Sequence, residues 1–114
     1  MTGAPVLSLR IDFGPDRRIG PGKIALLERI AALGSISAAA RDLGMSYKRA
    51  WDLVEALSQI IGTPVLSTQS GGKRGGGAAL TNAGAAVVFR FREIESAAAS
   101  AAALHLKALA AEIK

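Results

Sequence analysis

The stretch that decides the fold is GSISAAARDLGMSYKRAWDLVEAL, which runs from Gly34 to Leu57. Ser35 or Ser37 can cap a short helix, because a serine side chain accepts hydrogen bonds from the first free backbone N–H groups. That helix would end at Gly44, and Ser46 can cap the next one. The stretch therefore predicts two helices joined by a tight, glycine-containing turn of about three residues, which is the helix-turn-helix pattern.

The second of these helices is predicted over Tyr47–Ile61. Its apolar residues recur at steps of three and four, which is typical of an amphipathic helix. They are Ala50, Val54, Leu57 and Ile61. The opposite face is polar, is basic in its first turn and carries one large aromatic residue, Trp51.

Upstream, strict alternation of apolar and polar residues over Val6–Phe13 predicts a half-buried strand, which Gly14-Pro15-Asp16 ends. Pro21–Leu33 has apolar residues at helical spacing, Pro21 suits a first helical turn, and Gly34 suits the end of a helix. Arg17, Arg18 and Lys23 make a small basic cluster between the two elements. We expect these cations either to touch backbone phosphates or to lie in a solvated loop.

Downstream, Gly62-Thr63-Pro64 ends the helix-turn-helix, and Val65–Gln69 is prone to form a strand. A glycine-rich basic segment follows, and then the apolar residues 78–80. This order predicts a β-hairpin, the wing. Thr81 is a good N-cap, and nothing after Gly84 breaks a helix as far as Lys114.

The predicted fold is mostly α, with a small β wing, in the class of winged helix-turn-helix domains. Residues 1–80 would form the domain and residues 81–114 a long C-terminal helix of about 50 Å at 1.5 Å per residue. A helix of that length cannot bury its apolar stripe on so small a domain, so we expect it to pair with a second copy. The residues of the stripe are Val87, Phe91, Ile94, Ala98, Ala102, Leu106, Leu109 and Ile113.

The composition narrows the function. The chain has 114 residues, 14 Lys and Arg against 9 Asp and Glu, no Cys and one His. The net charge of +5 suggests a polyanionic partner. Absence of Cys excludes disulfides and thiolate metal sites, and no convergent set of reactive groups indicates an enzyme. The longest uncharged stretch is shorter than the ~18 residues of a spanning helix, so we expect no membrane partner and a cytoplasmic, nucleoid-associated protein.

The candidate DNA-binding residues lie at the helix starts and in the wing. The first group is Ser35, Ser37, Ser46, Tyr47, Lys48, Arg49, Trp51 and Asp52. Lys48 or Arg49 can donate to guanine in a major groove, and the serines stand where backbone N–H groups favour phosphate. In the wing, Lys73 and Arg74 stand among glycines that let the backbone approach a phosphate closely. The alternatives are an ordinary solvated helix face, a core position for Trp51 and a plain hairpin tip.

The residues Gly34–Leu57, followed by GGKRGGGAALTNAG over 71–84, resemble the N-terminal DNA-binding domain of ModE-type, molybdate-responsive regulators. The most specific motifs are SYKRAW at Ser46–Trp51 and the glycine-rich wing. More distantly, the chain resembles the helix-turn-helix of LysR-type regulators. The resemblance implies a homodimer that binds double-stranded DNA at a palindromic operator, with the long helix at the dimer interface.

Members of that family that sense molybdate carry additional C-terminal domains. Because this chain ends at Lys114, we expect it to lack them and to hold no cofactor, molybdate included. Its activity would then be set by its expression or by another regulatory protein. Two other functions fit the same charge. One is an architectural, nucleoid-type DNA binder without operator preference, and the other is a protein-interaction adaptor that docks through the long helix.

Overall fold

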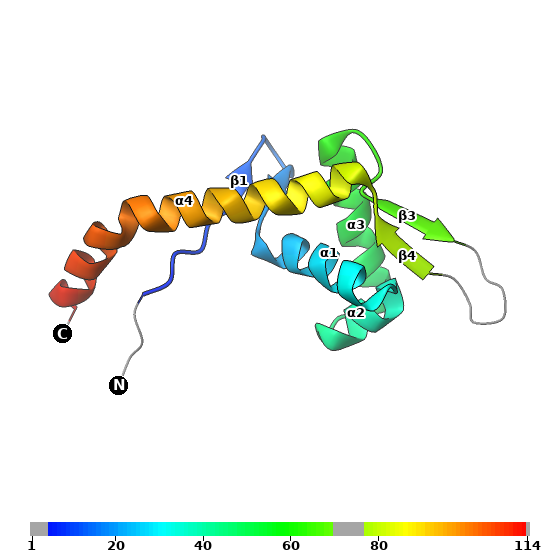
Figure 1. Ribbon diagram of the computed structural model, residues 1–114, viewed down its shortest axis with the longest axis horizontal. Coiled ribbons are helices and arrows are strands. Elements are labelled where there is room, and N and C mark those ends of the chain that lie inside the picture. Colours follow the sequence, from blue (N-terminus) through cyan, green and yellow to red (C-terminus); the bar gives the residue numbers. More distant parts are fainter. Residues whose placement is uncertain (1–4, 70–76, 114) are drawn as a thin grey trace.

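The computed structural model describes residues 5–69 and 77–113 of the chain. Four helices and four short strands follow one another in the order β1, β2, α1, α2, α3, β3, β4, α4. Their bounds are Ile11–Asp12, Arg18–Ile19, Pro21–Leu33, Ile36–Asp42, Tyr47–Ile61, Leu66–Gln69, Gly77–Leu80 and Asn82–Glu112. The molecule measures 57 × 32 × 23 Å, and α4 runs along its length while the wing projects at the other end (Figure 1). The winged helix-turn-helix fold is confirmed.

The core lies where α1, α2 and α3 meet the start of the wing. Its largest fully buried side chains are Ile24, Leu26, Leu27, Ile30, Leu57 and Val65. Burial of one such side chain contributes roughly 1.5–3 kcal/mol, which is more than an exposed ion pair supplies. This apolar centre therefore holds the three helices together, and the polar faces of α2 and α3 are not needed for the packing of the core.

Side-chain caps set the helix starts. Ser35 Oγ accepts from the Ala38 N–H at 3.1 Å, and Ser46 Oγ accepts from the Arg49 N–H at 3.0 Å. Thr81 Oγ1 does the same for the Gly84 N–H at 3.0 Å. Of the two serines that the sequence offered as a cap for the first short helix, Ser35 is therefore the one used. The predicted caps Ser46 and Thr81 are confirmed.

The wing is an antiparallel hairpin of β3 and β4, in which Leu66 pairs with Leu80 and Gln69 with Gly77. One backbone hydrogen bond holds it to the body, because Ala78 N donates to Gly34 O at 3.0 Å. At the base of the hairpin, Thr81 N donates to Val65 O at 3.0 Å and closes the wing. The orientation of the wing strands is thus tied to the start of the helix-turn-helix. Lys73 and Arg74, the predicted wing cations, lie outside the described residues.

The predicted N-terminal strand was too long. Alternation pointed to Val6–Phe13, whereas only Ile11–Asp12 forms a strand, paired with Arg18–Ile19. A strand needs a partner for its backbone, and the two residues of β2 are the only partner that the described chain offers. Val6 is consequently 88% exposed, although Ile11 still packs against the core.

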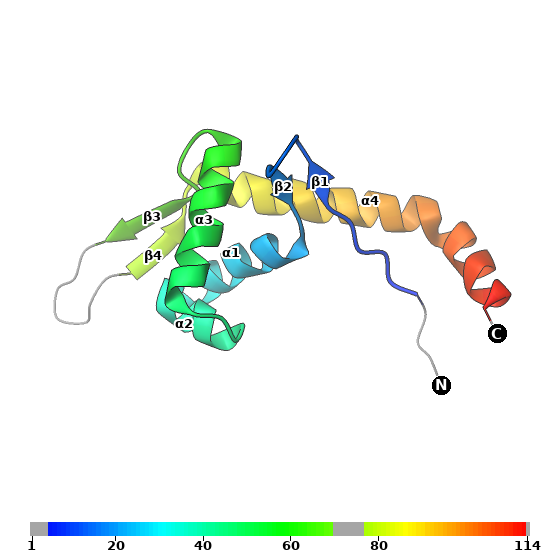
Figure 2. The same ribbon diagram turned by 180° about the vertical axis from the view of Figure 1, so that it is seen from behind.

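The predicted long C-terminal helix is confirmed as α4, although only its first part packs on the body. Figures 1 and 2 show the rest of α4 running past the domain, with its last turns bent. Phe91 is 2% exposed and belongs to the core, and Val87 packs against that core. These two members of the predicted apolar stripe therefore serve the chain's own fold.

Candidate nucleic-acid interface

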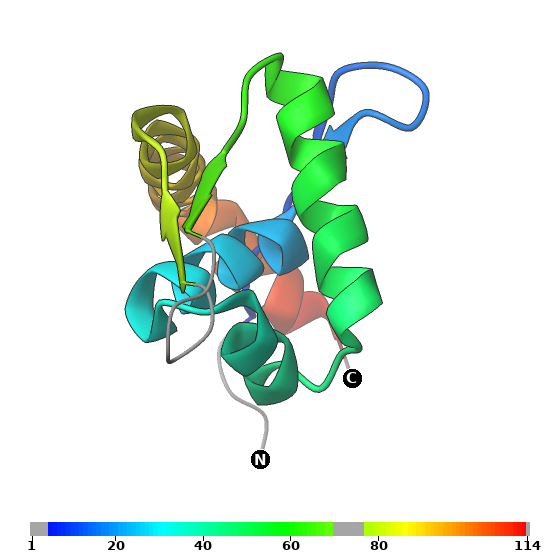
Figure 3. The same ribbon diagram turned by 90° about the vertical axis from the view of Figure 1, so that its right-hand side faces the viewer.

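A groove forms where the starts of α2 and α3 face the wing strands. Figure 3 shows the wing strands on one side and α3 on the other, with α1 and α2 between them. The groove has a volume of about 510 Å³. Its polar and aromatic lining comprises Ser35, Ser37, Tyr47, Trp51, Thr68 and Gln69. Four residues predicted from the sequence thus come together, and they are joined by two wing residues that the sequence did not single out.

Tyr47 and Trp51 form the aromatic part of this groove. Their ring centroids lie 6.2 Å apart with the planes at 75°, an edge-to-face pair. Tyr47 is 54% exposed, whereas Trp51 is half-buried and packs against the core. Trp51 therefore both packs on the core and lines the groove, as an amphipathic indole can do.

Lys48 lies beside this pair on the exposed side of α3. Its Nζ makes an ion pair with Asp52 Oδ2 at 3.0 Å, one helical turn on, and the two side chains are 84% and 58% exposed. Such an exposed pair is worth at most about 1 kcal/mol. Lys48 can therefore leave Asp52 and donate to an acceptor on another molecule with little loss of free energy.

Arg49 lies on a different side of α3. At 100° per residue it stands about 200° round the helix from Tyr47. There it borders a second groove, which Arg10, Arg18 and Lys23 also line. The two neighbours Lys48 and Arg49, grouped together by sequence, thus face different surroundings.

The third cation of the predicted basic cluster, Arg17, points elsewhere. Its Nη2 donates to the carbonyl of Ile60 at 3.2 Å, in the last turn of α3. A cation is favourable at that end of a helix because the carbonyl groups there carry partial negative charge. Arg17 therefore helps to terminate α3. Arg10, which the sequence reasoning did not single out, lines the second groove in its place.

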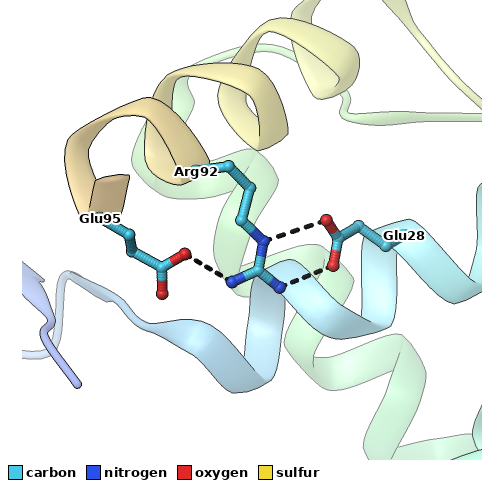
Figure 4. Close-up of polar contacts among 3 residues, drawn as sticks. All are labelled: Glu28, Arg92 and Glu95. Atoms are coloured by element: carbon cyan, nitrogen blue, oxygen red, sulfur yellow. Dashed lines mark hydrogen bonds and ion pairs between the residues drawn. The ribbon is translucent and has the colours of Figure 1, made fainter. Parts of the chain in front are cut away.

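An ion-pair network fixes α4 on α1 (Figure 4). Arg92 Nε and Nη2 donate to the two carboxylate oxygens of Glu28 at 3.0 and 2.7 Å, and Nη1 donates to Glu95 at 2.6 Å. The hydrogen bonds from Arg92 lower the pKa of Glu28, and the two carboxylates raise the pKa of Arg92. The bidentate geometry restricts rotation as well as distance, so it favours one orientation of α4 on α1 and adds to the packing of Phe91.

Beyond Phe91, several members of the predicted apolar stripe of α4 are open to solvent. Ile94, Leu109 and Ile113 are exposed, whereas Ala98, Ala102 and Leu106 are half-buried. Residues Pro5–Leu7 run along part of this helix and form a groove with it. The stretch of α4 that does not pack on the domain core therefore starts at about Ile94.

Within residues 5–69 and 77–113, no group of three or more His, Asp or Glu side chains is placed to hold a metal ion. In the same residues, no helix combines the length and the apolar character needed to cross a membrane.

The comparison with known families agrees with this geometry. The family model described as bacterial regulatory helix-turn-helix protein, lysR family, matches residues 22–85, from the first turn of α1 to the first turn of α4. The chain belongs to this family. The match covers all residues that line the first groove, whereas Arg10 and Arg18 of the second groove lie before it in the sequence.

Curated relatives of this lysR-family chain confirm the ModE-type resemblance. It is 48% identical over 82 residues to the molybdenum-pterin-binding protein MopB of Rhodobacter capsulatus, which covers 72% of this chain and 30% of MopB. It is 48% identical over 63 residues to the transcriptional regulator ModE of Haemophilus influenzae, covering 55% and 25%. It is 47% identical over 64 residues to the DNA-binding transcriptional dual regulator ModE of Escherichia coli (strain K12), covering 56% and 24%. The chain thus spans less than a third of the length of these relatives.

Proposed function

We propose that this chain is a sequence-specific DNA-binding transcriptional regulator that acts on double-stranded DNA in the cytoplasm, at the nucleoid. The observation that carries the proposal is the groove between α3 and the wing, because it leaves Tyr47, Lys48 and Trp51 open on one side of the second helix of a helix-turn-helix. That helix enters the major groove with its N-terminal residues at base edges. Lys48 then donates to guanine, and Trp51 packs on a thymine methyl or a sugar.

The backbone of the DNA is held on either side of these base contacts. The hydroxyls of Ser35, Ser37 and Ser46 stand at the helix starts, where exposed N–H groups favour phosphate oxygens. Lys73 and Arg74, which lie between the two wing strands in the sequence, contact an adjacent phosphate or minor groove. Asp52 releases Lys48 and then accepts from a base amino group.

The regulator acts as a homodimer on a palindromic operator. Apolar residues of α4 from Ile94 onward pair with the same residues of a second copy, and Ala98 and Ala102 allow the two helices to approach closely. The pairing residues are Ile94, Ala98, Ala102, Leu106, Leu109 and Ile113. A two-fold dimer places its recognition helices in successive major grooves, about 34 Å apart.

A selection experiment tests the DNA-binding proposal. The purified chain is incubated with fragmented genomic DNA at two salt concentrations, and the retained fragments are sequenced. We expect a shared two-fold symmetric sequence that persists at the higher salt. Retention without any shared sequence would show an architectural DNA binder instead, and failure to retain any duplex would point to a protein-interaction adaptor.

Lys48→Ala and Lys107→Ala give a matched pair for the base contact, because both remove an exposed lysine from a helix. We expect Lys48→Ala to reduce the preference for the selected sequence by a factor of about 5 to 150, equivalent to ~1–3 kcal/mol at one base pair. Lys107→Ala should leave that preference unchanged. Equal preference in both variants would remove Lys48 from the base contacts.

Sedimentation equilibrium tests the dimer. Leu106→Asp places a charge in the proposed pairing face and should shift the chain toward monomer at micromolar concentration. The exposed Lys107→Asp, one residue along, is the control and should remain dimeric. A wild-type chain that sediments as a monomer at all concentrations would refute the pairing.

A further inference from the structure

Four cationic side chains converge on the side of α3 that faces away from the wing. Arg10 comes from the segment before β1, Arg18 from β2, Lys23 from the first turn of α1 and Arg49 from the first turn of α3. They border a groove of about 370 Å³ that residues 20–22 also line. Because the four residues come from four separate elements, folding and not sequence proximity brings them together.

These charges are poorly compensated. Arg18 has one acidic neighbour, with Nε 3.7 Å from Asp12 Oδ2. Among the described residues, Arg10, Lys23 and Arg49 have no carboxylate within 4.0 Å. The first turn of α1 also holds no acidic residue. A concentration of like charge on a small domain costs stability unless an anion offsets it.

Lys23 is fixed inside this cluster. Its Nζ donates to the carbonyl of Arg18 at 2.7 Å. Burial, and then the charge of Arg49, lower the pKa of Lys23. Partial loss of solvent and the neighbouring guanidinium thus both disfavour the charged ammonium, and a bound anion would offset both effects.

The backbone makes room for the cluster. Gly20 is buried, and a Cβ built on it would lie 2.7 Å from Arg10 Cγ. Any other residue at position 20 would force the side chain of Arg10 away from the start of α1. The absence of a side chain at Gly20 thus lets the Arg10 stem cross over this turn and reach the groove.

We propose that Arg10, Arg18, Lys23 and Arg49 form a surface that binds the DNA backbone, so that Arg49 is a phosphate contact and not a reader of bases. The inference rests on the proposed function. An α-helix with its side chains is about 10–12 Å wide and the major groove about 12 Å, so phosphates flank a recognition helix on both sides. Lys48 lies about halfway round α3 between Tyr47, on the wing side, and Arg49. Lys48, in the middle of the exposed face of α3, therefore contacts the bases. The four-cation cluster faces the DNA strand on the side opposite the wing.

Salt-dependent titrations separate the two roles of Arg49. Wild type, Arg49→Gln and Lys23→Gln are titrated by fluorescence anisotropy with a duplex retained in the genomic selection and with a scrambled duplex of equal length. We expect each variant to bind both duplexes about 3- to 10-fold more weakly at 0.1 M salt, with the ratio between duplexes unchanged. The slope of log K against log salt should fall by ~0.9 per charge removed.

Arg17→Gln is the matched control, because it removes the same charge from the neighbour of Arg18 while its guanidinium lies at the other end of α3. Its effect sets the background of general electrostatics. Thermal unfolding followed by circular dichroism checks that all variants fold. A loss of affinity no larger than that of Arg17→Gln would overturn the proposal, and a lower preference for the retained duplex in Arg49→Gln would make Arg49 a base reader.

Two further arms identify the source of the phosphate. Wild type should bind a duplex with a neutral methylphosphonate at the contacted position more weakly than the unmodified duplex, whereas Arg49→Gln should bind both equally. If 10 mM inorganic phosphate shifts the Lys23 and Arg49 amide resonances while both variants keep wild-type DNA affinity, the surface binds a free anion and the proposal is overturned. If the wild-type chain binds both duplexes equally well, the proposed function is refuted. If the wild type prefers the retained duplex and both variants bind with wild-type affinity, only this inference is refuted.

Discussion

Replacement of Gly84 by alanine is expected to separate α4 from the wing. Gly84 is buried in the first turn of α4, and its N–H donates to Thr81 Oγ1 at 3.0 Å. A Cβ at this position would lie 3.1 Å from the carbonyl carbon and 3.3 Å from the Cα of Val65, and closer still to the carbonyl oxygen. That oxygen already accepts from Thr81 N, so it cannot move without loss of the bond that closes the wing.

The magnitude follows from competing terms. Alanine in place of glycine ordinarily favours a helix by up to about 1 kcal/mol. Overpacking of a close contact costs roughly 1–3 kcal/mol, and loss of the Thr81 cap costs about 1 kcal/mol more. Because the obstacle is backbone and not a flexible side chain, we expect a net destabilisation of about 2–3 kcal/mol, a large part of the stability of a small domain.

Urea unfolding followed by circular dichroism measures this effect. Gly22→Ala is the matched control, because it also lies in the first turn of a helix, where an added Cβ meets nothing within 4 Å. It should be neutral or slightly stabilising. If Gly84→Ala proves as stable as Gly22→Ala, the close approach of α4 to Val65 is not a constraint and the reasoning fails.

Three other predictions concern single contacts. Because the folded-state pKa of Glu28 is lowered, the stability from its pair with Arg92 is present above the ordinary value of 4.5 and is lost as pH falls below it. In Glu28→Gln, the urea midpoint should depend less on pH in that range. The free energy of unfolding should change by at most about 1 kcal/mol, because the pair is partly exposed. Thr81→Ala should cost about 1 kcal/mol in urea unfolding and the exposed Thr63→Ala little. Emission from Trp51, the one Trp of the chain, should change when the selected duplex is added, and a constant spectrum would remove Trp51 from the interface.

Helix limits could be predicted because local chemistry sets them. The predicted helices Pro21–Leu33 and Tyr47–Ile61 coincide with α1 and α3. Proline and a serine cap start them, and left-handed Gly34 and Gly62 end them, with φ of 70° and 88°. These signals act within one helical turn, so they need no knowledge of the rest of the chain.

The N-terminal strand could not be bounded in this way. Alternation over Val6–Phe13 reports which residues would share a face, but the length of a strand depends on its partner. Here the turn that includes Asp16, with φ of 59°, brings back only Arg18–Ile19. For the same reason, Thr68 and Gln69 could not be predicted as lining residues of the groove, because nothing in the local sequence shows that the wing strands approach α2.

The separation of Lys48 from Arg49 shows how far a sequence can assign contacts at this interface. Both are exposed cations in the first turn of α3, and composition treats them alike. Helical geometry alone turns them about 100° apart, so a helical wheel could have distinguished them. It could not have supplied what Arg49 meets there, because Arg10 reaches the groove only across Gly20, and Lys23 is fixed by a carbonyl of β2. A residue's direction is thus local information, whereas its chemical role depends on the neighbours that the fold supplies.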